Sequence, residues 1–239
     1  PTQRFAKHSK LIFSTRFLDG LALGKIGWEV KNRKENSTFY IFAKAMIRPD
    51  STDVNYLIDR NSWQPLKWNN TINTGIRHQY EYKKGEGRIH LGVRASSLGS
   101  DYSFSQLMLE TINDNYLGKF NIRTRFFAQI GTGSNLAPES ALYLAGANLE
   151  ELMENKFTRS AAFFPQDFGG FGNDMNHFHM GGGLNVRGYS GYLAPDQLSN
   201  GVVVPGYRGN TGISGNVEID LDGLVKLRPK LTRNWLHMD

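Results

Sequence analysis

The stretch "GKFNIRTRFFAQIG", residues 118–131, indicates the fold of this chain because its side chains alternate in polarity. One set of alternate positions is apolar: Phe120, Ile122, Phe126, Ala128 and Ile130. The other set carries Asn121, Arg123, Arg125 and Gln129. Successive side chains of a β-strand point to opposite faces, so the stretch predicts a long strand with one apolar and one polar face.

The same period of two recurs along most of the chain. It predicts strands at 11–17, 24–32, 38–48, 72–83, 88–96 and 102–112, with a weaker candidate at 53–58. "KKGEG" (83–87) and "SSLGSD" (96–101) are typical of turns between successive strands. Alternation returns after a long gap in "GISGNVEIDLDGLVKL" (212–227). These patterns predict an all-β, antiparallel meander.

Composition excludes several classes of protein. Hydrophobic residues make up 39% and aromatic residues 12%, and no apolar run approaches the ~18 residues that a membrane-spanning helix needs. The net charge is +6, but the 28 cations are spread along the chain, so no nucleic-acid partner is expected. The chain has no cysteine, which excludes a disulfide framework, a thiolate metal site and a cysteine nucleophile. The first ten residues lack the features of a signal peptide, so we expect either a protein that is not exported or an internal piece of a longer chain.

Alternation alone leaves two architectures open. A soluble sandwich buries its apolar face in a core, whereas an outer-membrane barrel turns that face to lipid and encloses the polar face in a lumen. Strands of about 10 residues and polar faces rich in Arg and Lys favour the barrel. The solvent face of a soluble sheet has a similar composition, so this pattern does not decide between them.

The segment 132–212 contains a motif that narrows the choice. Twelve of the 26 glycines lie between residues 169 and 212, and a connection this long argues for a functional loop. Near its end, "NVRGY" (185–189) resembles the VRGF or VRGY signature of the BamA and TpsB superfamily of outer-membrane assembly and translocation barrels. "PESALYLAGA" (138–147) is similar to the aromatic-x-x-Gly-Gly/Ala pattern that begins the same loop in that family.

The resemblance implies a fold, a latch and a function. The fold would be one incomplete transmembrane β-barrel, about nine of roughly sixteen strands, with strands in 1–131, a loop folding into the lumen in 132–212, and a returning strand and turn in 213–239. Arg187, next to Gly188, would pair with Glu218 first and Asp220 second, while Val186 and Tyr189 would pack against the lumen wall. The barrel would insert or translocate polypeptides at the bacterial outer membrane. Its partners would be outer-membrane lipid, unfolded polypeptide clients, and the remaining strands and N-terminal domains of a parent protein.

A narrower likeness gives an alternative function. "YLAGANLEELMENKFTRS" (143–160), "RGYSGYLAP" (187–195) and "LRPKLTRNW" (227–235) resemble the barrel region of outer-membrane proteins that carry a gluzincin-type aminopeptidase domain. The barrel would then anchor that domain to the membrane. This chain has no H-E-x-x-H motif, so any peptidase activity would lie outside it and the chain itself is not expected to be an enzyme. A third alternative is a soluble sandwich that binds a ligand through its long loop.

Other polar residues carry weaker signals. His177 and His179 lie on one side of an extended segment and are candidate metal ligands if Asp174 or Asp167 supplies a third donor. Asp220 and Asp222 share a strand face, but a neighbouring arginine makes charge pairing a better interpretation than acid-base catalysis. No phosphate loop, dinucleotide fingerprint or nucleophile elbow is present, so no cofactor is expected. "NLEELMEN" (148–155) predicts a short helical turn.

Overall fold

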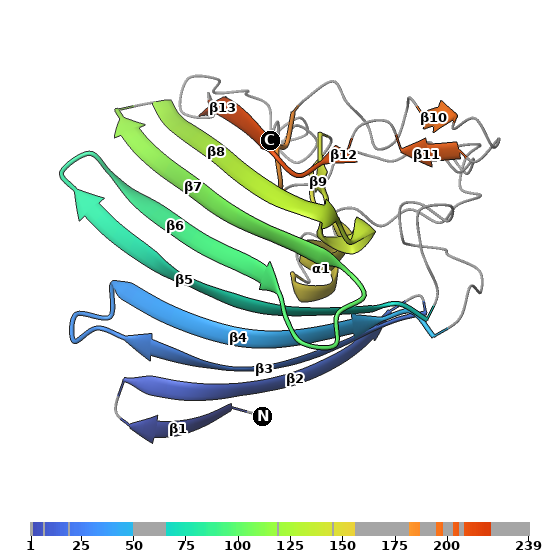
Figure 1. Cartoon of the computed structure of the whole chain (residues 1–239). Coiled ribbons are helices and arrows are strands. Elements are labelled where there is room, and N and C mark those ends of the chain that lie inside the picture. Colours follow the sequence, from blue (N-terminus) through green and yellow to red (C-terminus); the bar gives the residue numbers. More distant parts are fainter. Residues whose placement is uncertain are drawn as a thin grey trace, which may run out of the picture.

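A computed structural model describes residues 2–6, 8–18, 20–49, 66–118, 120–144, 146–155, 182–186, 195–197, 203–205 and 208–220. Its main element is an antiparallel meander of nine strands in which each strand pairs with the next in sequence, except that β13 follows β8 after a long connection (Figure 1). In spatial order the strands are β1 (Thr2–Ala6), β2 (Ser9–Leu18), β3 (Leu21–Lys31), β4 (Ser37–Ile47), β5 (Trp68–Tyr82), β6 (Gly85–Ser96), β7 (Ser103–Leu117), β8 (Phe120–Asn135) and β13 (Gly212–Asp220).

The predicted all-β meander is confirmed, with differences at particular elements. The alternation does not predict β1, and the candidate strand at 53–58 lies outside the described residues. Strand β8 continues to Asn135, four residues beyond the expected end of the strand region. Between β8 and β13 the structure adds the 3-10 helix η1 (Pro138–Ser140), helix α1 (Leu149–Glu154) and the short strands β9 (Leu142–Tyr143), β10 (Pro195–Gln197), β11 (Val203–Pro205) and β12 (Arg208–Gly209). The predicted turn at 148–155 is therefore helical.

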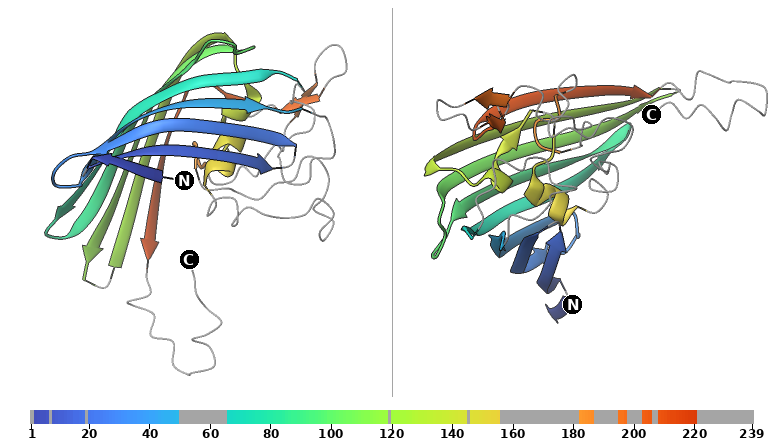
Figure 2. Two further views of the ribbon diagram at one scale, coloured as in Figure 1. Left: turned by 90° about the horizontal axis from the view of Figure 1, so that it is seen from below. Right: turned by 90° about the vertical axis from the view of Figure 1, so that its right-hand side faces the viewer.

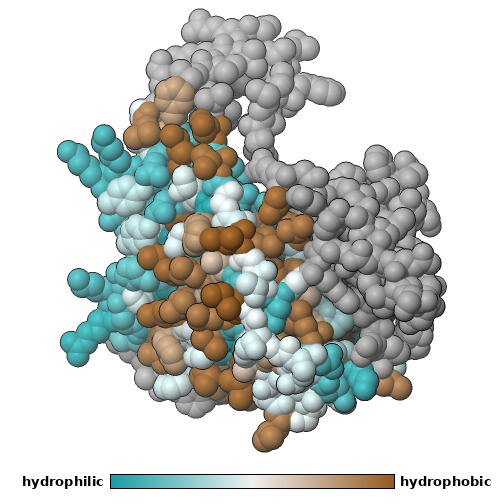
Figure 3. Space-filling view, turned by 45° about the horizontal axis from the view of Figure 1, so that its top comes forward, coloured by the Kyte–Doolittle hydropathy of each residue, from teal (hydrophilic) through white to brown (hydrophobic). Residues whose placement is uncertain are grey.

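The two faces of the sheet have opposite polarity, and the apolar face is exposed. Cross-strand pairing joins outward apolar residues into continuous rows, one of which is Phe39, Ile76, Leu91, Leu109, Ala128 and Ile213. Ile76 is 43% exposed and Ile213 is 69% exposed. These side chains form an apolar band over the surface of the sheet (Figure 3). The band extends over most of the strands, because Phe13, Trp28, Leu107 and Val217 are exposed as well.

The opposite face is concave and polar, and it curves around α1 and β9 (Figure 2). Buried polar residues on this face come from five strands: Glu29, Lys44, Asn69, Thr71, Asn73, Gln106 and Gln129. The clusters of buried apolar residues are small and lie between the sheet and the segment that comes after β8. The interior of this sheet is therefore largely polar.

Three tyrosines each reach across a glycine on the next strand to a polar side chain on the strand beyond it. On the concave face, Tyr40 of β4 crosses Gly75 and its hydroxyl lies 2.8 Å from Nε2 of His90 on β6. On the outer face, Tyr80 crosses Gly87 to donate to Asn113, and Tyr82 crosses Gly85 to donate to Asn115. A Cβ atom at Gly75 or Gly87 would lie 2.5 Å or less from a tyrosine ring or hydroxyl atom, so only glycine fits beneath the rings.

Helix α1 is short, with six residues. Among the described residues, no helix is both long enough and apolar enough to cross a membrane.

Candidate functional site

The residues after β8 fold back onto the concave face of the sheet. We call residues 136–155, described except for Ala145, the docked segment. Its apolar side chains Leu149, Leu152 and Met153 are buried against Leu21 and Leu23 of β3 and against Met46 of β4. The chain thus places apolar residues of α1 against the few apolar residues at one end of the concave face.

Helix α1 begins with a capping box. The side chain of Asn148 accepts a hydrogen bond from the backbone N–H of Glu151 at 2.9 Å, and the Glu151 carboxylate accepts one from the N–H of Asn148 at 3.1 Å. This arrangement satisfies two of the backbone donors that a helix start leaves without partners. A helix of six residues is unstable alone, so the stability of α1 depends on its packing against the sheet.

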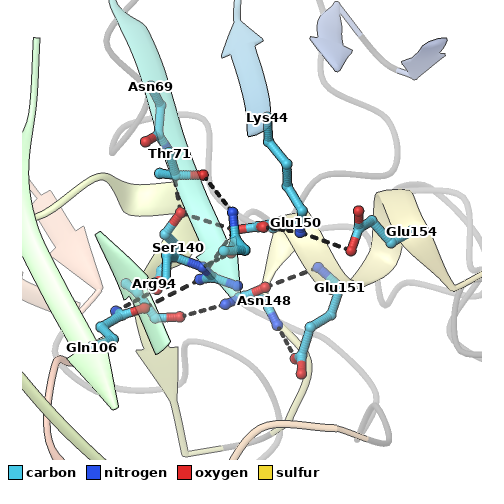
Figure 4. Close-up of polar contacts among 12 residues, drawn as sticks. Lys44, Asn69, Thr71, Arg94, Gln106, Ser140, Asn148, Glu150, Glu151 and Glu154 are labelled. Atoms are coloured by element: carbon cyan, nitrogen blue, oxygen red, sulfur yellow. Dashed lines mark hydrogen bonds and ion pairs between the residues drawn. The ribbon is translucent and has the colours of Figure 1, made fainter. Parts of the chain in front are cut away.

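A chain of ion pairs fastens α1 to the strands (Figure 4). Lys44 Nζ on β4 donates to Glu150 Oε1 at 2.6 Å and to Glu154 Oε2 at 2.9 Å. Lys25 on β3 donates to the other Glu154 oxygen at 2.9 Å. Arg94 on β6 lies 3.1 Å from Glu150 Oε2. The side chains of Lys44 and Glu150 are only 5% and 1% exposed, so this pair is shielded from solvent.

The surrounding cations keep these two carboxyl groups ionised. Burial alone would raise the pKa of Glu150, but Arg94 and Lys44 outweigh that effect and hold the pKa below its usual value. Burial would likewise raise the pKa of Glu154, but Lys44 and Lys25 lower it to about 2. Removing one partner of a buried pair leaves an uncompensated charge and costs roughly 3–5 kcal/mol. The ion pairs therefore bias the docked segment strongly toward this one arrangement.

Further hydrogen bonds extend the network along η1 and α1. Asn69 Nδ2 donates to Ser140 Oγ at 3.1 Å, and that hydroxyl donates to Glu150 Oε2 at 3.0 Å. Gln106 Nε2 donates to the Ser140 carbonyl at 3.0 Å. On the opposite side, Arg16 donates to the carbonyl of Met153 at 2.6 Å. Strands β2 to β7 thus all contribute to the site, β5 and β7 through amide side chains and the other four through cations.

Glu139 differs from the other acids of the docked segment. It is 4% exposed, and no cation within 4.0 Å of it is found among the described residues. Burial raises its pKa to about 7, and the nearby Glu150 carboxylate acts in the same direction. Hydrogen bonds from the backbone and from Asn69 to the Glu139 carboxyl group offset part of this rise. The Oδ1 atom of Asn69 is itself buried without a hydrogen-bond partner.

Residues 182–186, which precede the predicted Arg187, also lie on the concave face. Arg125 Nη2 donates to the Gly183 carbonyl at 2.7 Å, and Asn216 Nδ2 donates to the Asn185 carbonyl at 2.8 Å. Gly183 has φ +50, and a Cβ there would lie 2.4 Å from the Gly146 carbonyl oxygen. Glycine is therefore required for this close approach between the two parts of the loop.

Of the four residues that match the VRGY signature, 186–189, the structure describes Val186. Its N–H donates to the Leu144 carbonyl at 2.9 Å, and its side chain packs against the cluster of Phe127, Leu142 and Leu184. Val186 thus packs on the concave face of the sheet, and its predicted packing against a lumen wall stays a prediction. Arg187, Gly188, Tyr189, His177 and His179 lie outside the described residues.

The two predicted acidic partners lie at the far end of β13. Glu218 pairs in register with Arg123 of β8, and Asp220 pairs with Asn121. Both are on the polar set of alternate positions, as expected from the sequence. Within the described parts of the chain, no group of three His, Cys, Asp or Glu side chains is arranged to hold a metal ion.

The ion pairs that involve Lys44 and Arg94 are not predicted from the sequence. Lys44 stands out in the sequence as a single cation within the apolar run "FYIFAKAMI" (39–47), and "LEELME" (149–154) stands out as an acidic helix. These are weak signals, because residues 44 and 150 are 106 positions apart and no local pattern links them.

The chain has been compared with protein-family models and with curated proteins, and neither comparison finds a match.

Proposed function

We propose that this chain is part of an outer-membrane β-barrel that resembles the BamA-like superfamily and acts in the insertion or translocation of polypeptides. The observation that carries the proposal is the inverted polarity of the sheet. Its exposed face is apolar over most of its strands, and its covered face is charged. Water would make such an apolar surface unfavourable, since soluble monomers rarely expose patches larger than a few hundred Å². Lipid removes that cost and leaves the polar face to line a lumen.

The distribution of the connections supports the same proposal. At one end of the sheet every connection is short, and those between β5 and β6 and between β7 and β8 span two residues each. At the other end, besides the short connections 19–20 and 97–102, lie the connection 48–67 and the long loop between β8 and β13. Outer-membrane barrels have short periplasmic turns and longer extracellular loops. We therefore assign the long loop to the extracellular side.

Aromatic side chains flank the apolar band on β5. Trp68 lies on the outer face at the long-loop end of this strand, and Tyr80 and Tyr82 lie on the same face at the short-turn end. Between them come the apolar residues Ile72 and Ile76, both exposed. Such an order matches the aromatic girdles that border the lipid-facing band of a barrel.

The geometry of residues 182–186 supports the pairing of Arg187 with Glu218. Ser214 Oγ donates to the Leu184 carbonyl at 2.5 Å, and Asn216 donates to the next carbonyl, that of Asn185. The loop and β13 thus run alongside each other, and the next inward-facing residues of β13 after Asn216 are Glu218 and Asp220, so the loop leads toward both predicted acidic partners of Arg187. The ion pair would complete a loop that is already held by Lys44 and Arg94 through the docked segment.

The proposed work of the barrel is not enzymatic. A strand that enters lipid must satisfy its backbone hydrogen bonds, and an accessible sheet edge supplies partners for them. In the proposed protein the docked segment and the pair of Arg187 with Glu218 hold the barrel in shape while such an edge pairs with a client strand. The clients are unfolded polypeptides, and the remaining strands of the barrel come from the parent protein.

Quenching of tryptophan fluorescence by brominated lipid tests the membrane orientation. Trp28 lies on the outer face of β3 and is 46% exposed, so in the full-length protein with its other tryptophans replaced it should be quenched by lipids brominated along the acyl chain. A matched variant carries its only tryptophan on the concave face, at Phe127 (Phe127→Trp), where quenching should be weak. Equal quenching at the two positions, or recovery of the full-length protein without detergent, would refute the membrane proposal.

Client handling needs a separate test. Depletion of the parent protein should lower the amounts of other outer-membrane barrels or of exported polypeptides, and a plasmid-borne wild-type copy should restore them. If depletion leaves both unchanged while the protein proves to be a membrane barrel, the insertion or translocation role is wrong and the anchoring role remains.

A further inference from the structure

A cavity lies between the concave face and the docked segment. Its volume is about 160 Å³, and its wall includes Lys25, Arg77, Arg94, Glu151 and Glu154. Strands β3, β5 and β6 supply the cations and α1 supplies the two acids. The cavity exists within the described residues whether or not the sheet spans a membrane, so a ligand site in it is independent of the proposed function.

The charged groups around this cavity do not balance. Arg94, Lys44 and Lys25 share the carboxylates of Glu150 and Glu154. On the adjoining wall, Lys10 and Arg77 share one carboxylate, that of Glu29, at 2.6 and 3.4 Å. The described side chains of these two networks thus contain more cations than carboxylates, five against three. A net positive charge in a partly dehydrated site is unfavourable unless an anion compensates it.

The acids that border the cavity are already engaged. One oxygen of Glu154 accepts from Lys25 and the other from Lys44. The oxygens of Glu151 accept from the backbone N–H groups of Asn148 and Gly183. Glu151 adds a fourth carboxylate at the cavity wall, so the cations of the two networks still outnumber the carboxylates, five against four.

Two of the cations are held at the cavity wall by aromatic rings. Lys25 Nζ lies 3.9 Å from the centre of the Phe42 ring, and the Arg77 guanidinium carbon lies 4.5 Å from the centre of the Tyr40 ring. The two rings stack on each other at 5.1 Å. Cation–π contacts orient both side chains at little entropic cost, so the positive groups are positioned before any ligand arrives.

We infer that this cavity is a binding site for a small oxyanion of the size of phosphate. Guanidinium groups bind oxyanions through parallel N–H···O hydrogen bonds, and an ammonium group adds a compact charge. The volume accommodates one such ion with a few water molecules. Binding would neutralise the excess charge and strengthen the contact between α1 and the sheet.

Equilibrium dialysis of the purified full-length protein against radiolabelled orthophosphate, at constant ionic strength in sodium chloride, tests the site. Wild-type protein should bind phosphate saturably with a stoichiometry near one. Arg77→Gln should weaken binding by about tenfold or more, because it removes a charge-assisted hydrogen bond. Arg88→Gln is the matched control, since Arg88 lies on the concave face of β6 but borders neighbouring cavities instead of this one.

A third variant gives a result of opposite sign. Glu29→Gln removes the carboxylate that pairs with Arg77 and that would compete with phosphate for its guanidinium group. Phosphate should therefore bind the variant several times more tightly than it binds wild type. Damage to the fold cannot produce tighter binding, and this variant decides the matter if Arg77→Gln fails to fold. The inference is overturned if wild type shows no saturable binding, if Arg88→Gln loses as much affinity as Arg77→Gln, or if Glu29→Gln binds phosphate no better than wild type.

Discussion

Replacing Lys44 by methionine should release the docked segment from the sheet. Lys44 is the central cation of the ion-pair chain, because its ammonium contacts both Glu150 and Glu154 of α1. Methionine retains most of the aliphatic stem and its packing, so the main change is the loss of charge. In the variant, Glu150 keeps Arg94 and Ser140, while Glu154 keeps Lys25.

The residual pairing sets the size of the effect. Removing one partner of a buried pair costs roughly 3–5 kcal/mol, and the remaining cations place Lys44→Met near the lower end of this range. A loss of about 3 kcal/mol corresponds to roughly a hundredfold increase in the population of the released segment. The double variant Lys44→Met with Glu150→Gln should lose less than the sum of the two single variants, because no fully buried carboxylate is then left without its lysine.

Hydrogen exchange of the full-length protein measures this population directly. The amide N–H groups of Leu152 and Asn155 are hydrogen-bonded to Asn148 and Glu151, and the short helix that protects them cannot persist when undocked. Exchange at both amides should accelerate about a hundredfold in Lys44→Met. Lys10→Met is the matched control, because Lys10 pairs with Glu29 on the same face and should leave these amides unchanged. Unaltered exchange in Lys44→Met, or an equal effect of Lys10→Met, would refute the reasoning.

Further predictions concern pH, the backbone and the latch. Because the pKa of Glu139 is raised to about 7 when docked, its contribution favours docking below the ordinary value of 4.5 and is lost as the pH rises through about 7, a change of about 3 kcal/mol; exchange of the α1 amides should show this dependence and Glu139→Gln should reduce it. Burial raises the pKa of Glu151 as well, so Glu151 acts in the same sense, whereas Glu154 acts in the opposite sense between pH 4.5 and about 2; a fall in docking between pH 4.5 and 7 that is as large in Glu139→Gln as in wild type would contradict the assignment. Gly183→Ala should lower the melting temperature more than Gly118→Ala, since both glycines have positive φ but only Gly183 approaches a carbonyl oxygen; equal shifts would show that the contact with Gly146 is unimportant. Arg187→Glu and Glu218→Arg should each impair assembly of the full-length protein, as measured by heat-modifiable gel migration, and their combination should restore it; a double variant no better than either single one would disprove the pairing.

The strands could be predicted because their information is local. In Phe120–Asn135 and Gly212–Asp220 a period of two fixes both the element and its faces within a few residues. Strand β1 has only five residues, too few for the alternation to be distinctive, and the end of β8 reads "GTGSN", whose residues do not show an apolar face. The sequence also leaves open which face is covered, since alternation is the same for a soluble sheet and for a barrel.

The site could not be predicted to the same extent, for a physical reason. Lys44, Arg94 and Glu150 come together only when the curved sheet and the loop are both formed, and their separation along the chain hides the relation. The residues of the helical turn that begins at Asn148 are local, and the sequence does predict that turn. The acidity of Glu139, by contrast, depends on a burial that no sequence pattern reveals.

The tyrosines that cross glycines have a consequence for folding. A slip of two residues between β5 and β6 would keep every apolar side chain on its face, so hydrophobic patterning does not oppose it. Such a slip would move Tyr80 from Gly87 to a position opposite Gly85 or Ile89, and Tyr82 would no longer lie over Gly85. Either slip would leave one tyrosine opposite a residue other than glycine, and one of Asn113 and Asn115 would lose the hydroxyl group that reaches it. The tyrosine–glycine pairs therefore specify the register of these strands. They disfavour misaligned pairings that the alternation of polar and apolar side chains alone would allow during folding.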